Sequence, residues 1–238
     1  MDPISPLTPA WVSAPENVRL AGCEIHVWRA SLDLEPFVVE RLANTLAPHE
    51  ISKAERMVKP RDREHAIVAR GVLRCLLGAY AGVAPAALAF AYEVWGKPEL
   101  LSLGSGHPLR FNVSHSHGLA LFAFALRNRI GIDIEQIRDD YPCLAVAQRF
   151  FSPDEADSIS AIPEASQAEA FFATWTRKEA LAKAIGLGLQ LAFDAPEPAA
   201  VWPEGGWTVQ SFHPAPRYRA AVACEGNKPR LFFYDWAG

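Results

Sequence analysis

Three short runs in the middle of the chain are rich in apolar residues and are separated by very short connections. They cover residues 109–115, 119–126 and 130–137. Connections of this length join strands that lie side by side and run antiparallel, so the pattern predicts a three-stranded antiparallel meander. The second run is apolar at every position, which predicts a strand that is covered on both faces.

Apolar residues at helical spacing predict two long helices, one before and one after these strands. The first covers about 62–80 and the second about 166–185. The second helix should end at Gly186 or Gly188, because glycine readily adopts the left-handed conformation found at helix C-termini.

Two shorter helices are also expected. One covers 34–46, and the other starts at Pro153, where Ser152 and Glu155 form a capping-box pattern. Alternating apolar residues predict strands elsewhere, at 23–29, 90–94, 208–212, 218–224 and 231–234.

A short internal echo accompanies these elements. Residues 46–50 (LAPHE) resemble residues 151–155 (FSPDE), and each segment precedes a short and then a longer amphipathic helix. Such an echo would suit a duplicated fold, although a match of five residues is too short to establish one.

The composition narrows the classes of partner and location. The chain has 238 residues, half of them hydrophobic, and a net charge of -4. This charge argues against binding to bulk nucleic acid or to an anionic membrane, because both need a basic patch. The N-terminus lacks a secretion-signal pattern, and no apolar run approaches the roughly 20 residues of a membrane span. We therefore expect a soluble cytoplasmic protein.

The four cysteines show neither a metal-binding spacing nor a disulfide framework. They are spread along the chain without a C-x-x-C pair, at Cys23, Cys75, Cys143 and Cys224. We expect buried free thiols.

Two carboxylates share one face of the third predicted strand. Period-two alternation in IGIDIE places Asp133 and Glu135 with Gly131 on one face and three isoleucines on the other. Adjacent like charges are unfavourable unless a cation lies between them, and oxygen ligands suit Mg²⁺. An exposed, solvated face would explain the pair equally well.

A third carboxylate lies inside the apolar stripe of the second long helix. Glu179 follows Trp175 by four residues, and an unpaired carboxylate there would cost several kcal/mol or lose its charge. Lys183, four residues further on, offers the simple alternative of an ion pair within the helix.

Other polar residues could contact an anionic ligand. Ser114 and His115 end the first predicted strand, and Lys97 lies in a Gly-Lys-Pro break before it. Arg63 and Arg70, with Arg74, lie on one face of the first long helix and could bind phosphate. A solvated basic face and ordinary turn residues are the commoner explanations. The chain contains neither a phosphate-binding loop nor a dinucleotide-binding glycine motif.

Several of these segments together resemble the phosphopantetheinyl transferases of the large, surfactin-synthetase-activating type. The resembling stretches are 96–98 (GKP), 111–116 (FNVSHS), 131–135 (GIDIE) and 175–184 (WTRKEALAKA). The resemblance implies an α+β fold of two similar, pseudo-twofold-related halves, each a small, mainly antiparallel sheet packed with helices. We place the halves at 1–126 and 127–238, with coenzyme A between them.

The resemblance also implies a site and a reaction. Asp133, Glu135 and Glu179 would bind Mg²⁺, and Glu179, Lys183 and Asp133 would be catalytic. The residues that would contact coenzyme A are Arg63, Arg70, Lys97, Ser114, His115 and Lys183. The reaction would transfer the phosphopantetheine arm of coenzyme A to a serine of an apo acyl-carrier or peptidyl-carrier protein, releasing adenosine 3′,5′-bisphosphate.

Two rival functions stay open. A metal-dependent hydrolase could use the same acids to cleave a pyrophosphate with water, and a non-catalytic homologue could bind coenzyme A or the carrier without reaction. We expect a monomer that binds no nucleic acid and no membrane. The sequence does not identify the carrier or its pathway.

Overall fold

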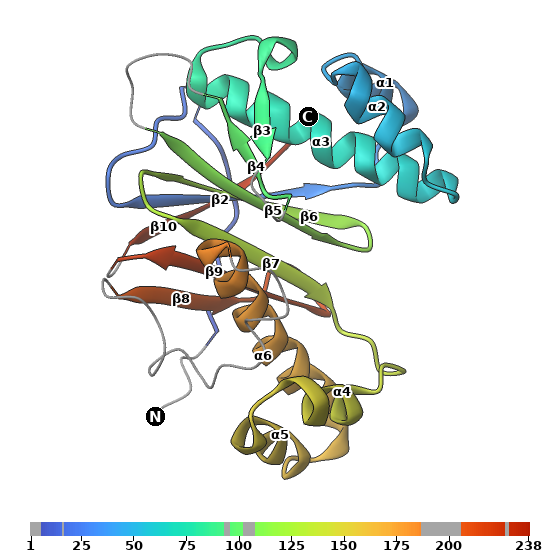
Figure 1. The fold of residues 1–238 in the computed structure, drawn as a ribbon, viewed down its shortest axis with the longest axis vertical. Helices are drawn as coiled ribbons and strands as arrows, with labels where there is room; N and C mark the ends of the chain where they lie inside the picture. Colours follow the sequence, from blue (N-terminus) through green and yellow to red (C-terminus); the bar gives the residue numbers. More distant parts are fainter. Residues whose placement is uncertain (1–5, 16, 93–95, 102–107, 187–205, 227–228) are drawn as a thin grey trace.

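The computed structural model describes residues 6–15, 17–92, 96–101, 108–186, 206–226 and 229–238. Two sheets form the centre of the fold, and helices cover the outer face of each (Figure 1). The larger sheet has the strand order β1-β10-β2-β6-β5, and the smaller has the order β7-β9-β8. The strands of the larger sheet are β1 Val12–Ser13, β2 Glu24–Ser31, β5 Leu109–Ser116, β6 Leu119–Leu126 and β10 Arg230–Asp235. Those of the smaller sheet are β7 Ile130–Gln136, β8 Trp207–Phe212 and β9 Tyr218–Glu225.

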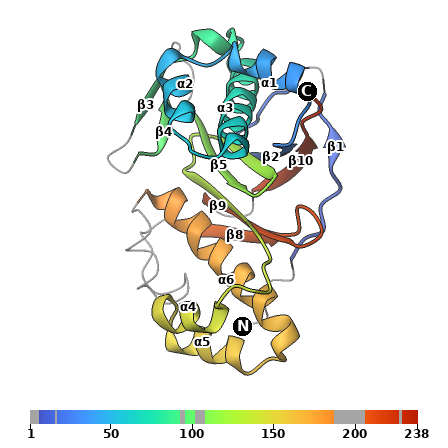
Figure 2. The ribbon, with the colours of Figure 1, turned by 90° about the vertical axis from the view of Figure 1, so that its right-hand side faces the viewer.

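The helices form two groups of three, one after β2 and one after β7. The first group is α1 Pro36–Ala43, α2 Pro48–Glu55 and α3 Pro60–Ala81, followed by the short 3₁₀ turn Pro85–Ala87 and the β3–β4 hairpin (Phe90–Tyr92 with Pro98–Leu100). The second group is α4 Cys143–Phe150, α5 Pro153–Ser160 and α6 Glu164–Ile185. Figure 2 shows the resulting layers, with α3 above the larger sheet and α6 against the smaller one.

The apolar core occupies the spaces between these layers. Between the two sheets, Val27 and Leu121 pack with Ile132 and Val222. On the other face of the larger sheet, the side chains pack against α3. Residues 120–125 of β6 are at most 2% exposed, which confirms that this strand is covered on both faces.

The two halves of the chain repeat one order of elements. In each, a strand precedes three helices and two further strands of the same sheet, and the sheet orders β2-β6-β5 and β7-β9-β8 correspond. The first half also has the β3–β4 hairpin after its helices. The helices α3 and α6 both have 22 residues, and each ends at a left-handed glycine, Gly82 or Gly186. The predicted α+β fold of two similar halves is therefore confirmed.

The sequence echo marks a repeated local structure. At the start of α5, the Ser152 side chain accepts a hydrogen bond from the Glu155 amide, and Glu155 accepts one from the Ser152 amide. At the start of α2, Glu50 accepts the corresponding bond from the Ala47 amide. Ala47 has no side-chain oxygen, so only half of the capping box forms there.

The predicted three-stranded meander is wrong. Strands β5 and β6 pair antiparallel, but β7 joins the other sheet and pairs with β9. A strand has only two edges, and those of β6 are occupied by β5 and β2. The connection 127–129, where Arg127 has a φ of 67°, leads the chain into the smaller sheet instead.

Most other predicted elements are present, with ends shifted by a few residues. The strands at 23–29, 208–212, 218–224 and 231–234 and the four predicted helices are found, and α2 is the short helix expected after residues 46–50. Helix α4 and strands β1 and β4 were not predicted. The predicted strand at 90–94 extends into residues outside the described ones, as does the possible helix end at Gly188.

The two ends of the chain connect the two sheets. Near the N-terminus, Leu7 bridges to Phe212 of the smaller sheet, and Val12 and Ser13 pair with β10 of the larger. Strand β10 itself lies beside β2. The division of the chain after residue 126 stays a prediction, and the structure adds that the last strand returns to the first half.

The cysteines are free, but they are not all buried as expected. Cys143 and Cys224 are buried, Cys75 is half-buried and Cys23 is exposed. Cys23 lies just before β2, outside the packed layers, which explains the difference.

Candidate active site

Strand β7 and helix α6 bring the three predicted acids to one place. A side chain at Gly131 would overlap the carbonyl oxygen of Ala180 and the amide nitrogen of Ala184, so helix and strand are in backbone contact there. Glycine in a strand interior commonly permits such an approach. Asp133 follows on the same face of β7, and Glu179 lies on the facing side of α6; both are buried.

Lys183 and Ser114 hold the carboxylate of Asp133. The Lys183 ammonium is 2.6 Å from Asp133 Oδ1, and the Ser114 hydroxyl donates to the same oxygen at 2.8 Å. Lys183 also donates to the Ser114 hydroxyl at 3.1 Å and lies 3.9 Å from Glu179 Oε2. Lys183 therefore connects α6 to both β7 and β5. The predicted ion pair with Glu179, within the helix, is the longer of the two contacts that Lys183 makes with carboxylates.

Glu135 has a hydroxyl partner of its own. Its Oε2 accepts a hydrogen bond of 2.8 Å from Ser116, two residues beyond Ser114 on β5. The end of β5 thus lies beside the acidic part of β7.

Burial and mutual repulsion change the acidity of these groups. Burial, with the nearby charge of Asp133, raises the pKa of Glu179 to about 7 despite the opposing ammonium of Lys183. Burial and the charge of Asp133 also raise the pKa of Glu135. At neutral pH, Glu179 is therefore divided between a proton acceptor and a protonated acid.

His115 lies next to this cluster with its side chain open to solvent. The pKa of His115 is lowered because the surrounding protein partly desolvates the imidazolium, and because Lys183 and His65 oppose a further positive charge. A neutral imidazole at this position can accept or donate a hydrogen bond.

The ammonium of Lys97 contacts main-chain oxygens at the edge of the cluster. It donates to the carbonyl of Lys183 at 2.7 Å and to that of Ile130 at 3.1 Å. Lys97 thus ties the β3–β4 hairpin to the last turn of α6 and the start of β7, where a cation is favoured by the helix dipole.

The row of arginines on α3 has three different environments. Arg63 is exposed and donates to the carbonyl of Met57, whereas Arg74 is 1% exposed and donates to Glu50 at 2.7 Å. Arg70 also donates to Glu50, and its guanidinium lies 4.2 Å from the centre of the Phe90 ring. Of these three arginines, only Arg63 fits the alternative explanation of a solvated basic face.

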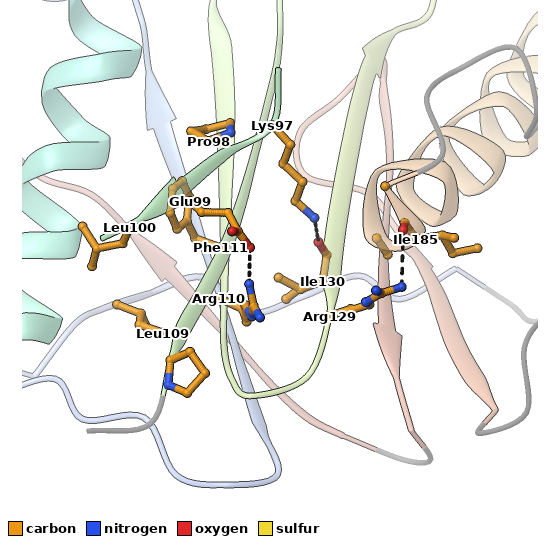
Figure 3. A pocket seen from close by; sticks show the side chains of 13 residues that line it. Lys97, Pro98, Glu99, Leu100, Leu109, Arg110, Phe111, Arg129, Ile130 and Ile185 are labelled. Carbon is orange, nitrogen blue, oxygen red and sulfur yellow. Dashed lines mark hydrogen bonds and ion pairs between the residues drawn. The ribbon is translucent and has the colours of Figure 1, made fainter. Parts of the chain in front are cut away.

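A hollow of about 470 Å³ lies beside the last turn of α6, between the two halves (Figure 3). The first half lines it from Lys97 to Leu100 and from Pro108 to Phe111, and the second half lines it with Arg129, Ile130 and the end of α6. In Figure 3, the Arg110 guanidinium points to Glu99, and Arg129 points to the carbonyl of Ile185.

Comparisons with known proteins identify the family of this chain. The model of the 4′-phosphopantetheinyl transferase superfamily matches residues 129–226, and that of a 4′-phosphopantetheinyl transferase N-terminal region matches 34–126. The 4′-phosphopantetheinyl transferase HetI of Nostoc sp. is 36% identical over 232 residues, which cover 94% of this chain and 98% of that protein. The chain belongs to the 4′-phosphopantetheinyl transferase superfamily. The Bacillus subtilis transferase Sfp is 29% identical over 66% of this chain and 67% of its own length.

Membership of the transferase superfamily confirms the resemblance inferred from the motifs. It leaves the roles of individual residues as predictions. The described helices are all too short or too polar to span a lipid bilayer.

The acids of this superfamily member provide suitable ligands for a hard divalent cation. Across the described residues, no three acidic, histidine or cysteine side chains converge closely enough to hold a metal as they stand. However, Asp133 Oδ2 is buried without a hydrogen-bond partner, and burial together with the charge of Asp133 raises the pKa of Glu179 and of Glu135. An oxygen-only donor set with an unpartnered oxygen fits Mg²⁺, and Lys183 supplies the positive charge at Asp133 in this structure.

Two residues beside the candidate site were not identified from the sequence. Asn112 and Ser116 lie on the same face of β5 as Ser114, and both contact β7. The period-two alternation of FNVSHS places both residues on the same face as Ser114, which is a signal in the sequence. To interpret this signal, one must also know that β7 lies against this face of β5.

Proposed function

We propose that this protein transfers the 4′-phosphopantetheine arm of coenzyme A to a serine of an apo acyl-carrier or peptidyl-carrier protein. The observation that carries the proposal is the cluster of Asp133, Glu179 and Lys183 between β7 and α6. It combines carboxylates that could hold a metal ion with an ammonium group, and metal ions and lysines recur in sites of phosphoryl transfer.

Glu179 is suited to accept the proton of the carrier serine. General bases work best with a pKa near the operating pH, and the pKa of Glu179 is about 7 in the metal-free protein. A cation bound to Glu179 would lower this pKa. The base acts on the serine hydroxyl directly or through one water.

Lys183 is suited to stabilise the departing adenosine 3′,5′-bisphosphate. Its ammonium lies on the side of α6 that faces β5 and β7, where it donates to Ser114 as well as to Asp133. The same group can donate to a phosphate oxygen that gains charge as the bond breaks. Ser114 and His115 would contact the pyrophosphate beside it.

The proposed metal ligands are Asp133, Glu135 and Glu179. Mg²⁺ held there would neutralise charge on the pyrophosphate. Coenzyme A would lie between the two halves, near the hollow beside Lys97, with Arg63 and Arg70 toward the nucleotide phosphates. The cytoplasmic location, the monomeric state and the absence of nucleic-acid and membrane partners stay predictions.

The decisive experiment incubates the protein with coenzyme A, Mg²⁺ and an apo-carrier protein and measures the intact mass of the carrier. We expect the carrier to gain the mass of phosphopantetheine, and the gain to disappear when Mg²⁺ is chelated. Consumption of coenzyme A without a mass gain would support a hydrolase instead. No consumption, with coenzyme A still bound, would support a non-catalytic homologue.

A further inference from the structure

One face of β5 is polar where its neighbour in the sheet is apolar. Asn112 and Ser114 pair in register with Ala123 and Leu121 of β6, which belong to the core between the two sheets. Side chains two residues apart on a strand share a face, so Ser116 lies on this side as well. All three polar residues are buried.

These side chains connect β5 to β7 at the place where the two sheets meet. The Asn112 carbonyl oxygen accepts from the Ile132 amide at 2.8 Å, and the Ser116 hydroxyl accepts from the Gln136 amide at 3.2 Å. Strand β7 pairs only with β9 in the described sheets. Side chains of β5 therefore satisfy the buried amide of Ile132 and the half-buried amide of Gln136, and an unpaired amide buried at this place would cost free energy.

Ser116 differs from Asn112 in what else it contacts. Its hydroxyl donates to Glu135 Oε2 at 2.8 Å while accepting from the amide of the next residue, Gln136. The same oxygen lies 3.2 Å from Nδ1 of His117. A hydroxyl has one proton, and here that proton is directed to the carboxylate while the backbone amide fixes the oxygen.

We propose that Ser116 is a positioning residue that orients the Glu135 carboxylate for metal binding, and that Asn112 only anchors the strand. The inference rests on the proposed function, because Glu135 must be a metal ligand. Groups that hydrogen-bond to metal ligands fix the ligands' orientation, and their loss commonly weakens metal binding 10- to 100-fold.

The test compares two substitutions of equal shape, Ser116→Val and Ser116→Thr. Both add a methyl group, but only threonine keeps the hydroxyl. Calorimetric titration of MgCl₂ into the protein saturated with coenzyme A measures metal affinity directly, without a carrier and without turnover. We expect Ser116→Val to weaken Mg²⁺ binding by about 10-fold or more, and Ser116→Thr to restore most of that loss.

The structural control is Asn112→Leu, which removes a strand contact but no contact to a carboxylate. It should lower the thermal midpoint and weaken Mg²⁺ binding less than Ser116→Val does. If Ser116→Val does not fold, Ser116→Ala removes the hydroxyl without added bulk, and the same weakening is expected.

Two results would overturn this inference and leave the proposed function intact. In one, Ser116→Val binds Mg²⁺ as tightly as wild type. In the other, Ser116→Val and Ser116→Thr weaken Mg²⁺ binding equally. A wild-type protein that transfers phosphopantetheine but gives no Mg²⁺ binding signal would instead overturn the metal site. A wild-type protein that neither binds Mg²⁺ nor modifies the carrier would overturn the proposed function, and the inference with it.

Discussion

The ammonium of Lys183 lies 2.6 Å from Asp133 Oδ1 but 3.9 Å from Oε2 of Glu179, its neighbour one helical turn away. The lysine thus pairs across the gap between helix and strand in preference to its own helix. Asp133 therefore has the shorter ion pair with this ammonium and Glu179 the longer one.

Replacing Lys183 with methionine should raise the pKa of Glu179 above its present value of about 7, because the ammonium lowers it. The change can be followed in the Mg²⁺-free protein by carbon NMR titration of glutamate carboxyl groups, assigned with Glu179→Gln. Transfer to the carrier should fall by a factor of about 10² or more. Lys183→Arg keeps the charge and should leave the Glu179 pKa nearly unchanged. An unshifted titration in Lys183→Met would contradict the electrostatic coupling.

Replacing Glu179 with glutamine should stabilise the Mg²⁺-free fold at alkaline pH while abolishing transfer. The folded-state pKa of Glu179 is raised from an ordinary 4.5 to about 7, so the folded state holds the proton more tightly than the unfolded chain. Stability from this group is complete below about pH 4.5 and is lost as the pH rises through about 7. At about 1.4 kcal/mol for each pH unit between 4.5 and about 7, the loss of stability at alkaline pH is at most roughly 3.5 kcal/mol.

Urea unfolding at a series of pH values measures this effect. The wild-type free energy of unfolding should decline relative to Glu179→Gln between about pH 4.5 and 8. Parallel curves would show that the Glu179 carboxylate is not desolvated. Retained transfer by Glu179→Gln would refute its role as base.

Local sequence signals predicted the elements and the acids of the site. Alternation in IGIDIE placed Asp133 and Glu135 on one face, and the stripe of α6 placed Glu179 inside. The glycine C-cap of α6 and the Ser152 capping box were also predictable, because their causes lie within a few residues. Helix α4 was not predicted, since it has no side-chain cap to mark its start, unlike α5, which has the same length.

Pairings between distant segments could not be read in this way. Short connections suggested that β7 would lie beside β6, but β2, about a hundred residues earlier, occupies that edge. The partner of Lys183 likewise depends on how closely α6 approaches β7. The burial of Arg74 depends on Glu50, which a pattern within α3 does not contain.

Arg74 and Arg63 lie on one helix and should give opposite results when each is changed to methionine. Arg74→Met should lower the free energy of unfolding by about 3 kcal/mol, because it breaks a buried pair with Glu50. Arg63→Met should leave stability unchanged, within about 0.5 kcal/mol, because Arg63 is exposed.

The same substitution also tests the proposed contact with coenzyme A. If Arg63 contacts the nucleotide phosphates, Arg63→Met should raise KM for coenzyme A with little change in kcat. Chemical unfolding and carrier-labelling kinetics measure both, and an unchanged KM would remove Arg63 from the coenzyme A site.

Gly131 offers the sharpest test of how the fold positions the site. A Cβ at Gly131 would overlap the backbone of α6 at Ala180 and Ala184, and backbone atoms cannot move aside as a flexible side chain can. In Gly131→Ala, the helix must shift away from β7, which separates Glu179 and Lys183 from Asp133. We expect a loss of about 1–3 kcal/mol in stability and a fall in transfer rate larger than the stability loss explains, measured where the variant is fully folded. Gly22→Ala is the matched control, because no atom lies within 4 Å of the added carbon and both properties should be unchanged. A Gly131→Ala protein with wild-type transfer would show that the site tolerates a displaced helix, and that close contact between α6 and β7 serves packing alone.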